Sequence, residues 1–266
     1  MRNQVLLPTI MGVQAAGGHC VLNLPLGMTY DLIQFAVTNI TAANMLNFKV
    51  KVGSSTIVDL ASFQDFEDLN TFYRRQTQAG FLTLWFYRPE YQEDVRALTS
   101  LGTADITAPI TIEFDLPALT SPAITAYAVQ RPPQVMGAIT KIREYTANFT
   151  AAGLMAIDNI PRGARIAAFH LRKAAGDVTN LDLEINNGSG AALVQTGPKA
   201  LYETIQKQYN RVPVTATYTH MDLCLLGDFA SPMPTAQLAD MRLKPTVGSS
   251  GSVVTMVEYI DGLRGV

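Results

Sequence analysis

Three histidines are the side chains of this sequence best suited to metal or acid–base chemistry. They are His19, His170 and His220, and no two of them form a short H-x-H pair. A metal-dependent β-sandwich enzyme of the cupin kind needs histidines and a carboxylate that converge on one ion, because these groups supply neutral and anionic donors. His170 and His220 could meet across two sheets, but ordinary histidines within strands are the favoured interpretation.

Motifs for covalent catalysis or nucleotide binding are missing from the sequence. Ser, His and Asp all occur, but no G-x-S-x-G turn frames a serine nucleophile. Neither a Walker loop nor a G-x-G-x-x-G fingerprint is present. The sequence therefore predicts no catalytic residues, no required cofactor and a protein that is not an enzyme.

Acidic clusters are the remaining candidates for ion binding. Asp65-Phe66-Glu67-Asp68 and Glu90-Tyr91-Gln92-Glu93-Asp94 could supply oxygen ligands to calcium. Carboxylates at the start of a helix also favour its positive end, and this structural interpretation is preferred for both clusters. Asp228 follows Leu226-Gly227 and is read as a turn residue before a ligand. Metal ligands stay unassigned.

Composition limits the class of protein. The 266 residues are 48% hydrophobic and 16% charged, with a formal net charge of −2 and a pI near 5.9. A dedicated nucleic-acid binder needs clustered Lys and Arg, so direct nucleic-acid binding is not expected. No stretch approaches the ~20 apolar residues of a membrane span. Cys20 and Cys224 lie in apolar runs, where free thiols are favoured over a disulfide.

The chain contains two similar halves. Leu24-Pro25-Leu26-Gly27 and Ile160-Pro161-Arg162-Gly163 each separate two apolar runs, at a sequence offset of 160 − 24 = 136. This offset is close to half of the chain length. We therefore expect Pro25 and Pro161 to occupy equivalent turns of two copies of one domain.

Other segments follow in the same order in both halves. Alternating strands are expected at 48–53 and 181–186, helix-like stretches at Phe63–Phe72 and 198–208, and longer strands at 81–88 and 214–226. A short amphipathic segment (95–101 and 238–243) then precedes a final strand, Ile110–Leu116 in one half and residues 253–260 in the other.

Prolines suggest where the two domains meet. The segment 117–133 contains prolines at 117, 122, 132 and 133, and proline resists inclusion in a central strand. We expect domain 1–135, with an exposed N-terminal arm and a proline-rich linker, and domain 136–266. Residues 136–149 are expected to form a strand or a helical turn.

The strand pattern predicts an all-β fold. Short strands separated by turn signals favour β-sandwiches over βα units. In Ile110–Leu116 the apolar residues alternate with Thr111, Glu113 and Asp115, as expected for a strand with one buried face. Two tandem eight-stranded jelly-roll sandwiches, with short helices in the connecting loops, fit these features.

An aromatic run, Leu84-Trp85-Phe86-Tyr87, supports an alternative function. An exposed aromatic row could bind carbohydrate, although alternating aromatic residues in a strand more often pack in a core. Two sandwiches with low charge and no catalytic set suggest assembly or adhesion.

Several segments together resemble one protein family, the major capsid proteins of corticoviruses, which are icosahedral, membrane-containing double-stranded DNA bacteriophages. The sequence is similar in Phe86-Tyr87-Arg88-Pro89-Glu90 and in residues 15–20, 24–30, 101–103, 113–115, 165–170, 241–244 and 257–259. These segments span nearly the whole chain in order. Specificity lies in the series, since none of them is a catalytic fingerprint.

The resemblance implies a structural role in the virion. It implies a double jelly roll, a homotrimer that forms a pseudo-hexameric capsomer, and an icosahedral capsid shell around a lipid membrane, made in the host cytoplasm. Implied partners are neighbouring capsomers, minor proteins at the vertices and in the membrane, and the viral membrane itself, touched weakly or indirectly. It also implies that structural calcium can bind, without assigning ligands. The alternatives are a carbohydrate-binding or adhesive sandwich (fibre or spike) protein and, less favoured, a cupin-like enzyme.

Overall fold

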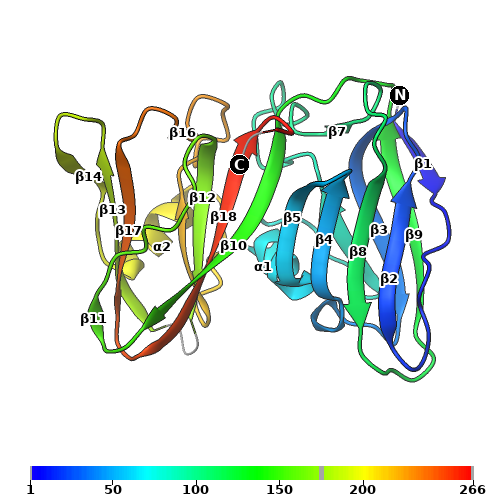
Figure 1. The fold of residues 1–266 in the computed structure, drawn as a ribbon, viewed down its shortest axis with the longest axis horizontal. Coiled ribbons are helices and arrows are strands. Elements are labelled where there is room, and N and C mark those ends of the chain that lie inside the picture. Colours follow the sequence, from blue (N-terminus) through cyan, green and yellow to red (C-terminus); the bar gives the residue numbers. More distant parts are fainter. Residues whose placement is uncertain (1, 174–176, 265–266) are drawn as a thin grey trace. The chain divides into compact units, whose positions relative to one another are not determined.

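Strands dominate the protein. A computed structural model describes residues 2–173 and 177–264 (Figure 1), and 48% of the chain is strand and 9% helix. The chain divides into two compact units. The first contains the residues up to Arg143 together with Gly262–Arg264, and the second is Glu144–Asp261.

The first unit contains two antiparallel sheets. One has the order β1-β9-β3-β6, with β7 beside β3, and the other has the order β5-β4-β8-β2. The elements are β1 (Asn3–Leu6), β2 (Gly18–Leu24), β3 (Thr29–Thr38), the 3₁₀ helix η1 (Ala42–Asn44), β4 (Leu46–Val52), β5 (Ser55–Ser62), α1 (Phe63–Phe72), β6 (Phe81–Trp85), β7 (Leu101–Gly102), β8 (Ile110–Leu116) and β9 (Ala123–Arg131).

The second unit repeats this arrangement. Its sheets have the orders β15-β12-β18-β10, with β16 beside β12, and β14-β13-β17-β11. The elements are β10 (Ile139–Phe149), which begins in the first unit, and β11 (Gly153–Leu154), β12 (Arg165–Arg172), β13 (Val178–Asn186), β14 (Ala191–Gln195), α2 (Lys199–Gln208), β15 (Tyr218–Asp222), β16 (Met233–Pro234), β17 (Asp240–Val247) and β18 (Gly251–Asp261).

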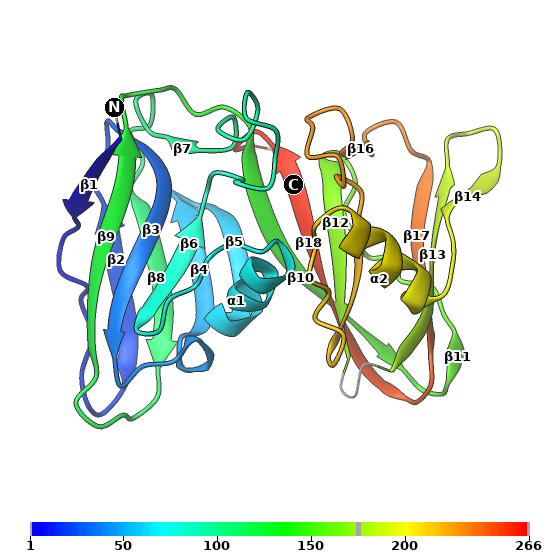
Figure 2. The ribbon, with the colours of Figure 1, turned by 180° about the vertical axis from the view of Figure 1, so that it is seen from behind.

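Each element of the first unit thus has a counterpart in the second, with the exception of η1. The counterparts, by order and pairing, are β1/β10, β2/β11, β3/β12, β4/β13, β5/β14, α1/α2, β6/β15, β7/β16, β8/β17 and β9/β18. Figure 2 shows a helix beside the strands of each unit. α1 lies against β5 and β6, and α2 lies against β13 and β15, so the helices share the equivalent strands β6 and β15. The predicted double jelly roll and its two helices are confirmed.

Both cores form from strand faces that alternate. In β8 the residues Ile110, Ile112, Phe114 and Leu116 are buried while the residues between them are partly exposed, as predicted. An edge-on pair of rings, Phe48 and Phe63, packs inside the first unit with centroids 4.8 Å apart. In the second unit, Phe169, Leu171, Leu181, Leu183 and Val257 belong to one buried cluster.

The predicted proline-rich linker is wrong in one respect, because it contains a central strand. β9 lies between β1 and β3, and its prolines stand outside it, at 117 and 122 before the strand and at 132 and 133 after it. Its buried positions are Ala126, Ala128 and Gln130, which carry a weak hydrophobic signal. The predicted boundary between residues 135 and 136 stays a prediction.

Because β9 lies in the segment predicted as a linker, the predicted match between the two halves is shifted at its end. Ile110–Leu116 corresponds to β17, and β18 corresponds to β9, so the predicted pairing of the last strands is wrong by one element. The segment 238–243, predicted as amphipathic, runs into strand β17, and the predicted strand 214–226 is confined to β15. The N-terminal arm is also more structured than predicted, because β1 pairs with β9.

Candidate functional site

A buried threonine holds the turn that leads into β3. The Thr103 hydroxyl accepts a hydrogen bond from the Gly27 N–H (2.8 Å) and donates one to the Met28 carbonyl (2.7 Å). Thr103 follows β7, which pairs with the start of β3. Gly27 has φ +101°, a conformation that favours glycine. The threonine therefore fixes this turn to the neighbouring strand.

The second unit contains the same arrangement at the equivalent place. The Thr235 hydroxyl accepts from the Gly163 N–H (2.8 Å) and donates to the Ala164 carbonyl (2.6 Å). Thr235 follows β16, which pairs with the start of β12, and Gly163 has φ +126°. Because Gly27 and Gly163 have the same sequence offset as Pro25 and Pro161, the prediction that these prolines lie in equivalent turns is confirmed.

Both helices end in the same way. Tyr73 and Tyr209 are the C-cap residues of α1 and α2, and each is followed by a residue in the left-handed region, Arg74 at φ +54° and Asn210 at φ +62°. A left-handed residue after the cap is a common helix stop. The two tyrosines again have the sequence offset of the prolines.

A buried side-chain amide connects each helix to the next strand. Asn70 of α1 donates from Nδ2 to the Thr83 carbonyl in β6 (3.0 Å), and Gln206 of α2 donates from Nε2 to the His220 carbonyl in β15 (2.7 Å). A buried amide needs such partners, since a buried polar group without a hydrogen bond is costly. In both units, a hydrogen bond from a side-chain amide thus connects the helix to the next strand.

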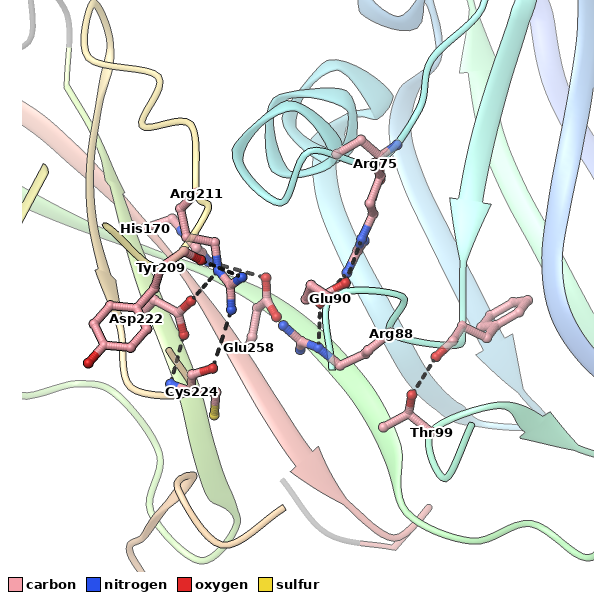
Figure 3. Close-up of polar contacts among 12 residues, drawn as sticks. Arg75, Arg88, Glu90, Thr99, His170, Tyr209, Arg211, Asp222, Cys224 and Glu258 are labelled. Carbon is pink, nitrogen blue, oxygen red and sulfur yellow. Dashed lines mark hydrogen bonds and ion pairs between the residues drawn. The ribbon is translucent and has the colours of Figure 1, made fainter. Parts of the chain in front are cut away.

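An arginine beyond each helix forms a buried ion pair. In the first unit, Arg75 forms two hydrogen bonds to the Glu90 carboxylate, from Nε (3.2 Å) and Nη2 (2.8 Å), and Arg88 Nε forms a third (2.8 Å), as Figure 3 shows. All three side chains are buried. Burial alone would raise the pKa of Glu90, but the two guanidinium groups hold that pKa below its usual value.

Arg211 is the counterpart of Arg75 at the same sequence offset, with a different carboxylate. Its Nε donates to Asp222 Oδ2 at the end of β15 (2.8 Å), and its Nη2 donates to the Cys224 carbonyl (3.3 Å), as drawn in Figure 3. Asp222 Oδ1 accepts from the Cys224 N–H (2.7 Å). The ion pair is buried and ties the chain after α2 to the end of β15.

His170 and His220 do meet, along one sheet rather than across two. They are direct partners in the antiparallel ladder of β12 and β15, and their Nδ1 atoms lie 2.7 Å apart. His170 Nε2 lies 3.2 Å from Glu258 Oε1 on β18, on the other side of β12. All three residues are buried.

The hydrogen bonds of these residues fix one consistent set of protons. The Val214 N–H donates to His220 Nε2 (3.2 Å), so the proton of a neutral His220 is on Nδ1. The Nδ1–H of His220 therefore donates to His170 Nδ1. The proton of a neutral His170 is then on Nε2, and it donates to Glu258. Burial, followed by His170 and Lys199, lowers the pKa of His220 well below 6.5, against the opposing effect of Glu258.

Another polar cluster surrounds Asp31 in the first unit. Its carboxylate accepts hydrogen bonds from Arg131 Nε (2.6 Å), Arg2 Nε (2.8 Å) and Ser100 Oγ (2.8 Å). Asp31 is buried, whereas the Arg2 side chain is about half exposed. This cluster joins the N-terminal segment, β3 and β9.

The acidic clusters predicted as candidate ion sites have internal partners. Glu67 accepts from Asn70 Nδ2 (3.1 Å), and Glu93 pairs with Arg96 (2.9 Å). Asp228 accepts from the backbone N–H groups of Ala230 and Ser231, which confirms its interpretation as a turn residue. Over residues 2–173 and 177–264, no three His, Cys, Asp or Glu side chains are arranged to hold a metal ion. The metal ligands remain unassigned.

The other predicted residues have structural surroundings. Cys20 and Cys224 are free and buried, and burial, with Asp115, raises the pKa of Cys20 to about 11, so its thiol is a poor nucleophile. His19 lies on an exposed face, with Nδ1 2.8 Å from Asp115. Trp85 is partly buried and lies beside the Tyr87 ring, with centroids 5.7 Å apart.

Two hollows of the surface lie beside the threonine turn of the second unit and beside Arg131 of the Asp31 cluster. One of about 540 Å³ lies over the turn at Pro161 and Gly163, and one of about 450 Å³ lies beside Leu98 and Val135. The histidine pair and the buried arginines line neither of these two hollows. Neither helix of the described chain is long and apolar enough to cross a membrane. The polar clusters connect separate elements within each unit.

Known viral proteins share this arrangement. Residues 5–131 match the family described as viral coat protein P2 N-terminal domain, and residues 139–263 match the corresponding C-terminal domain. The chain is 29% identical over 270 residues to the major capsid protein P2 of Pseudoalteromonas phage PM2, which covers 98% of this chain and 97% of that protein.

Solved structures agree with the sequence matches. The crystal structure of the major capsid protein P2 from bacteriophage PM2 superposes with a TM-score of 0.91 at 26% identity, over 100% of both chains. A chain of Sulfolobus Turreted Icosahedral Virus gives 0.72 at 11% identity, covering 99% of this chain and 91% of that one, which shows the fold alone. The corticovirus resemblance seen in the sequence is thereby confirmed, and the chain belongs to the P2 family of double jelly-roll viral coat proteins.

Proposed function

We propose that this coat protein assembles as a homotrimer, and that such trimers are the pseudo-hexameric capsomers of an icosahedral shell around a lipid membrane. The observation that carries the proposal is the duplication of the whole unit, down to the buried threonines Thr103 and Thr235. Three chains with two similar units each would present six similar units to their neighbours, which suits a near-hexagonal lattice. Closed cyclic symmetry is the usual outcome of homo-oligomer assembly.

We also propose that the protein has no enzymatic activity. Its titratable groups are used in buried pairs such as Arg211–Asp222 and His170–His220, and each of these groups already has a partner within its own unit. A catalytic site needs a nucleophile or base beside a space for substrate. The buried thiol of Cys20 and the histidine pair do not offer that combination.

The proposed partners are neighbouring capsomers, and minor virion proteins at the vertices and in the membrane. Direct contact with the membrane should be weak, because anionic lipid attracts clustered Lys and Arg at about 1 kcal/mol each, and this chain has a net charge of −2. Structural calcium belongs to the proposal without assigned ligands. Purified protein that co-sediments tightly with anionic liposomes at physiological salt, with no other viral protein, would contradict the weak membrane contact.

The oligomeric state is the direct test. Light scattering of the purified protein should give three times the chain mass of 28.9 kDa. Electron microscopy of purified virus particles should show a closed shell of near-hexagonal outline. A stable monomer at micromolar concentration, with no trimer in assembled particles, would contradict the proposal. An adhesive fibre or spike protein would instead give no closed lattice.

A further inference from the structure

In the first unit, another strand covers the outer edge of β5. The start of β10 pairs in parallel with β5, in the register Ile142↔Val58 and Arg143↔Asp59. The Arg143 side chain adds a hydrogen bond to the Thr56 carbonyl (2.5 Å). Val58 is only 3% exposed. β5 is therefore an interior strand with partners on both edges.

β14 is the same strand in the second unit. β5 pairs with β4 and β14 pairs with β13, and each ladder has a register shift at the same place, between Val50 and Lys51 in β4 and between Leu183 and Glu184 in β13. Because Val50 pairs with Val58 and Leu183 pairs with Gln195, Gln195 is the counterpart of Val58.

The outer edge of β14 is open. β14 pairs with β13 alone among the strands described, and every residue from 187 to 196 is exposed, with Leu193 at 54%. The strand reads Ala191-Ala192-Leu193-Val194-Gln195, without charge or proline. Exposed edge strands usually carry charges, prolines or covering segments that prevent pairing with another chain. An apolar, uncharged edge of this kind is expected to be covered in the assembled protein.

The strand equivalent to β10 is β1. Each pairs with the last strand of its unit, β10 with β18 and β1 with β9, and the sequence offset of the repeat aligns residues 3–7 with residues 139–143. On its other edge β1 has no strand partner within residues 2–173 and 177–264, and Leu6 is 65% exposed. Its sequence, Asn3-Gln4-Val5-Leu6, is uncharged like that of β14. One chain thus has an open edge on β1 and an open edge on β14.

We propose that β1 of a second copy of the chain adds in parallel to the open edge of β14, as β10 adds to β5. The inference rests on the proposed homotrimer and specifies which surfaces meet. The contact joins two different surfaces, so it is heterologous, and in the proposed homotrimer three such contacts form a closed ring. Transferring the register of β10 and β5 places Leu6 of one copy opposite Gln195 of the next. Backbone pairing between two uncharged strands buries no charge, and exposed edges of this kind are known routes of strand addition.

Disulfide trapping between two chains tests this register. Leu6→Cys and Gln195→Cys would be placed in separate, differently tagged chains and co-expressed, so that the bond can form only between copies. Neighbouring strands lie about 5 Å apart, within the reach of a disulfide. Oxidation should shift the protein from the monomer band to a covalent dimer with both tags. A second pair, Gln4→Cys with Leu193→Cys, lies two residues back along both strands and guards against a single unfavourable substitution.

The matched control moves the second cysteine from the edge of β14 to an exposed loop residue. Leu226, which is 60% exposed, takes the place of Gln195 as the cysteine partner of Leu6→Cys. Trimers by light scattering, with neither test pair giving more dimer than the control, would overturn the inference and leave the homotrimer standing. A wild-type chain that is monomeric both in solution and in particles would overturn the homotrimer, and the inference with it.

Discussion

The two units share one backbone plan but fill equivalent positions with different chemistry. Arg75 and Arg211 occupy the same place after their helices, yet the first meets Glu90 and the second meets Asp222. Glu90 comes from the loop beyond β6, whereas Asp222 ends β15. The arginine is therefore buried and paired with a carboxylate in both units, but the carboxylate comes from a different place in each unit.

A second difference lies in the ladder of β12 with β15 and in the equivalent ladder of β3 with β6. His170 and His220 pair directly in the second unit, and their counterparts by register in the first unit are Gln34 and Thr83. Glu258 likewise corresponds to a neutral residue, Val129. One unit thus has titratable side chains where the other has none, so the two copies should respond differently to pH.

The largest expected effect is the loss of a buried carboxylate. Glu90→Gln removes the carboxylate charge that Arg75 and Arg88 share, and breaking a buried ion pair on one side costs about 3–5 kcal/mol. Asp222→Asn removes the carboxylate charge beside one arginine, Arg211, and should cost less. Hydrogen exchange followed by mass spectrometry should show the loss of protection in the first unit for Glu90→Gln and in the second for Asp222→Asn. Equal losses in both units from either variant would mean that the two pairs do not act locally.

The duplicated threonines should give equal effects in the two units. Thr103→Val and Thr235→Val each leave a glycine N–H and a carbonyl without a partner, which costs about 2 kcal/mol. The controls Thr103→Ser and Thr235→Ser keep the hydroxyl and should lose about 0.8 kcal/mol for the missing methyl group. Urea unfolding of the four variants measures these differences. A serine variant as unstable as its valine counterpart would show that packing, and not the hydrogen bonds, holds the turn.

Buried His220 predicts a loss of stability in mild acid. The pKa of His220 lies well below 6.5 in the folded protein, so the unfolded chain binds the proton first as the pH falls. Stability should therefore be full above about pH 6.5 and decline from there toward the lower, folded pKa. The double variant His170→Gln, His220→Thr installs the residues of the first unit and should flatten the decline between about pH 7 and pH 5 in thermal melts. An unchanged slope would assign the decline to other groups.

Much of the fold could be predicted because the patterns that encode it are local. Ile110–Leu116 alternates fully, α1 presents Phe63, Phe66 and Leu69 to the core at helical spacing, and the turns at Pro25 and Pro161 mark the repeat. β9 escaped prediction because its buried positions are alanines and a glutamine between proline-rich flanks. Burial of small residues leaves little hydrophobic alternation to detect.

The threonine contacts could not be predicted, because their partners are far apart in the chain. Thr103 and Gly27 are 76 residues apart, and nothing in either local sequence indicates the other. The repeat itself contained a usable signal: Tyr73 and Arg75 recur as Tyr209 and Arg211 at the same sequence offset as the prolines. Arg75 and Arg211, which recur at this offset, form buried ion pairs in their own units.

The smallest expected effect concerns a surface ion pair whose charges are exchanged between the units. Lys51 of β4 lies 2.6 Å from Glu113 of β8, and the equivalent strands carry Glu184 on β13 and Lys244 on β17, 3.1 Å apart. Partly exposed pairs of this kind contribute about 0–1 kcal/mol.

Exchanging the charges in the first unit tests whether position or sign matters. Lys51→Glu alone places two carboxylates together and should lower the free energy of unfolding by up to about 1 kcal/mol, and Glu113→Lys alone should do the same. The double variant restores the order of charges found in the second unit and should recover part of the loss. Full recovery is not expected, because Glu113 also accepts a hydrogen bond from Thr111 (2.9 Å) that a lysine cannot accept. A double-mutant cycle with no coupling at low salt would mean that the pair contributes nothing and that its exchanged signs are neutral drift.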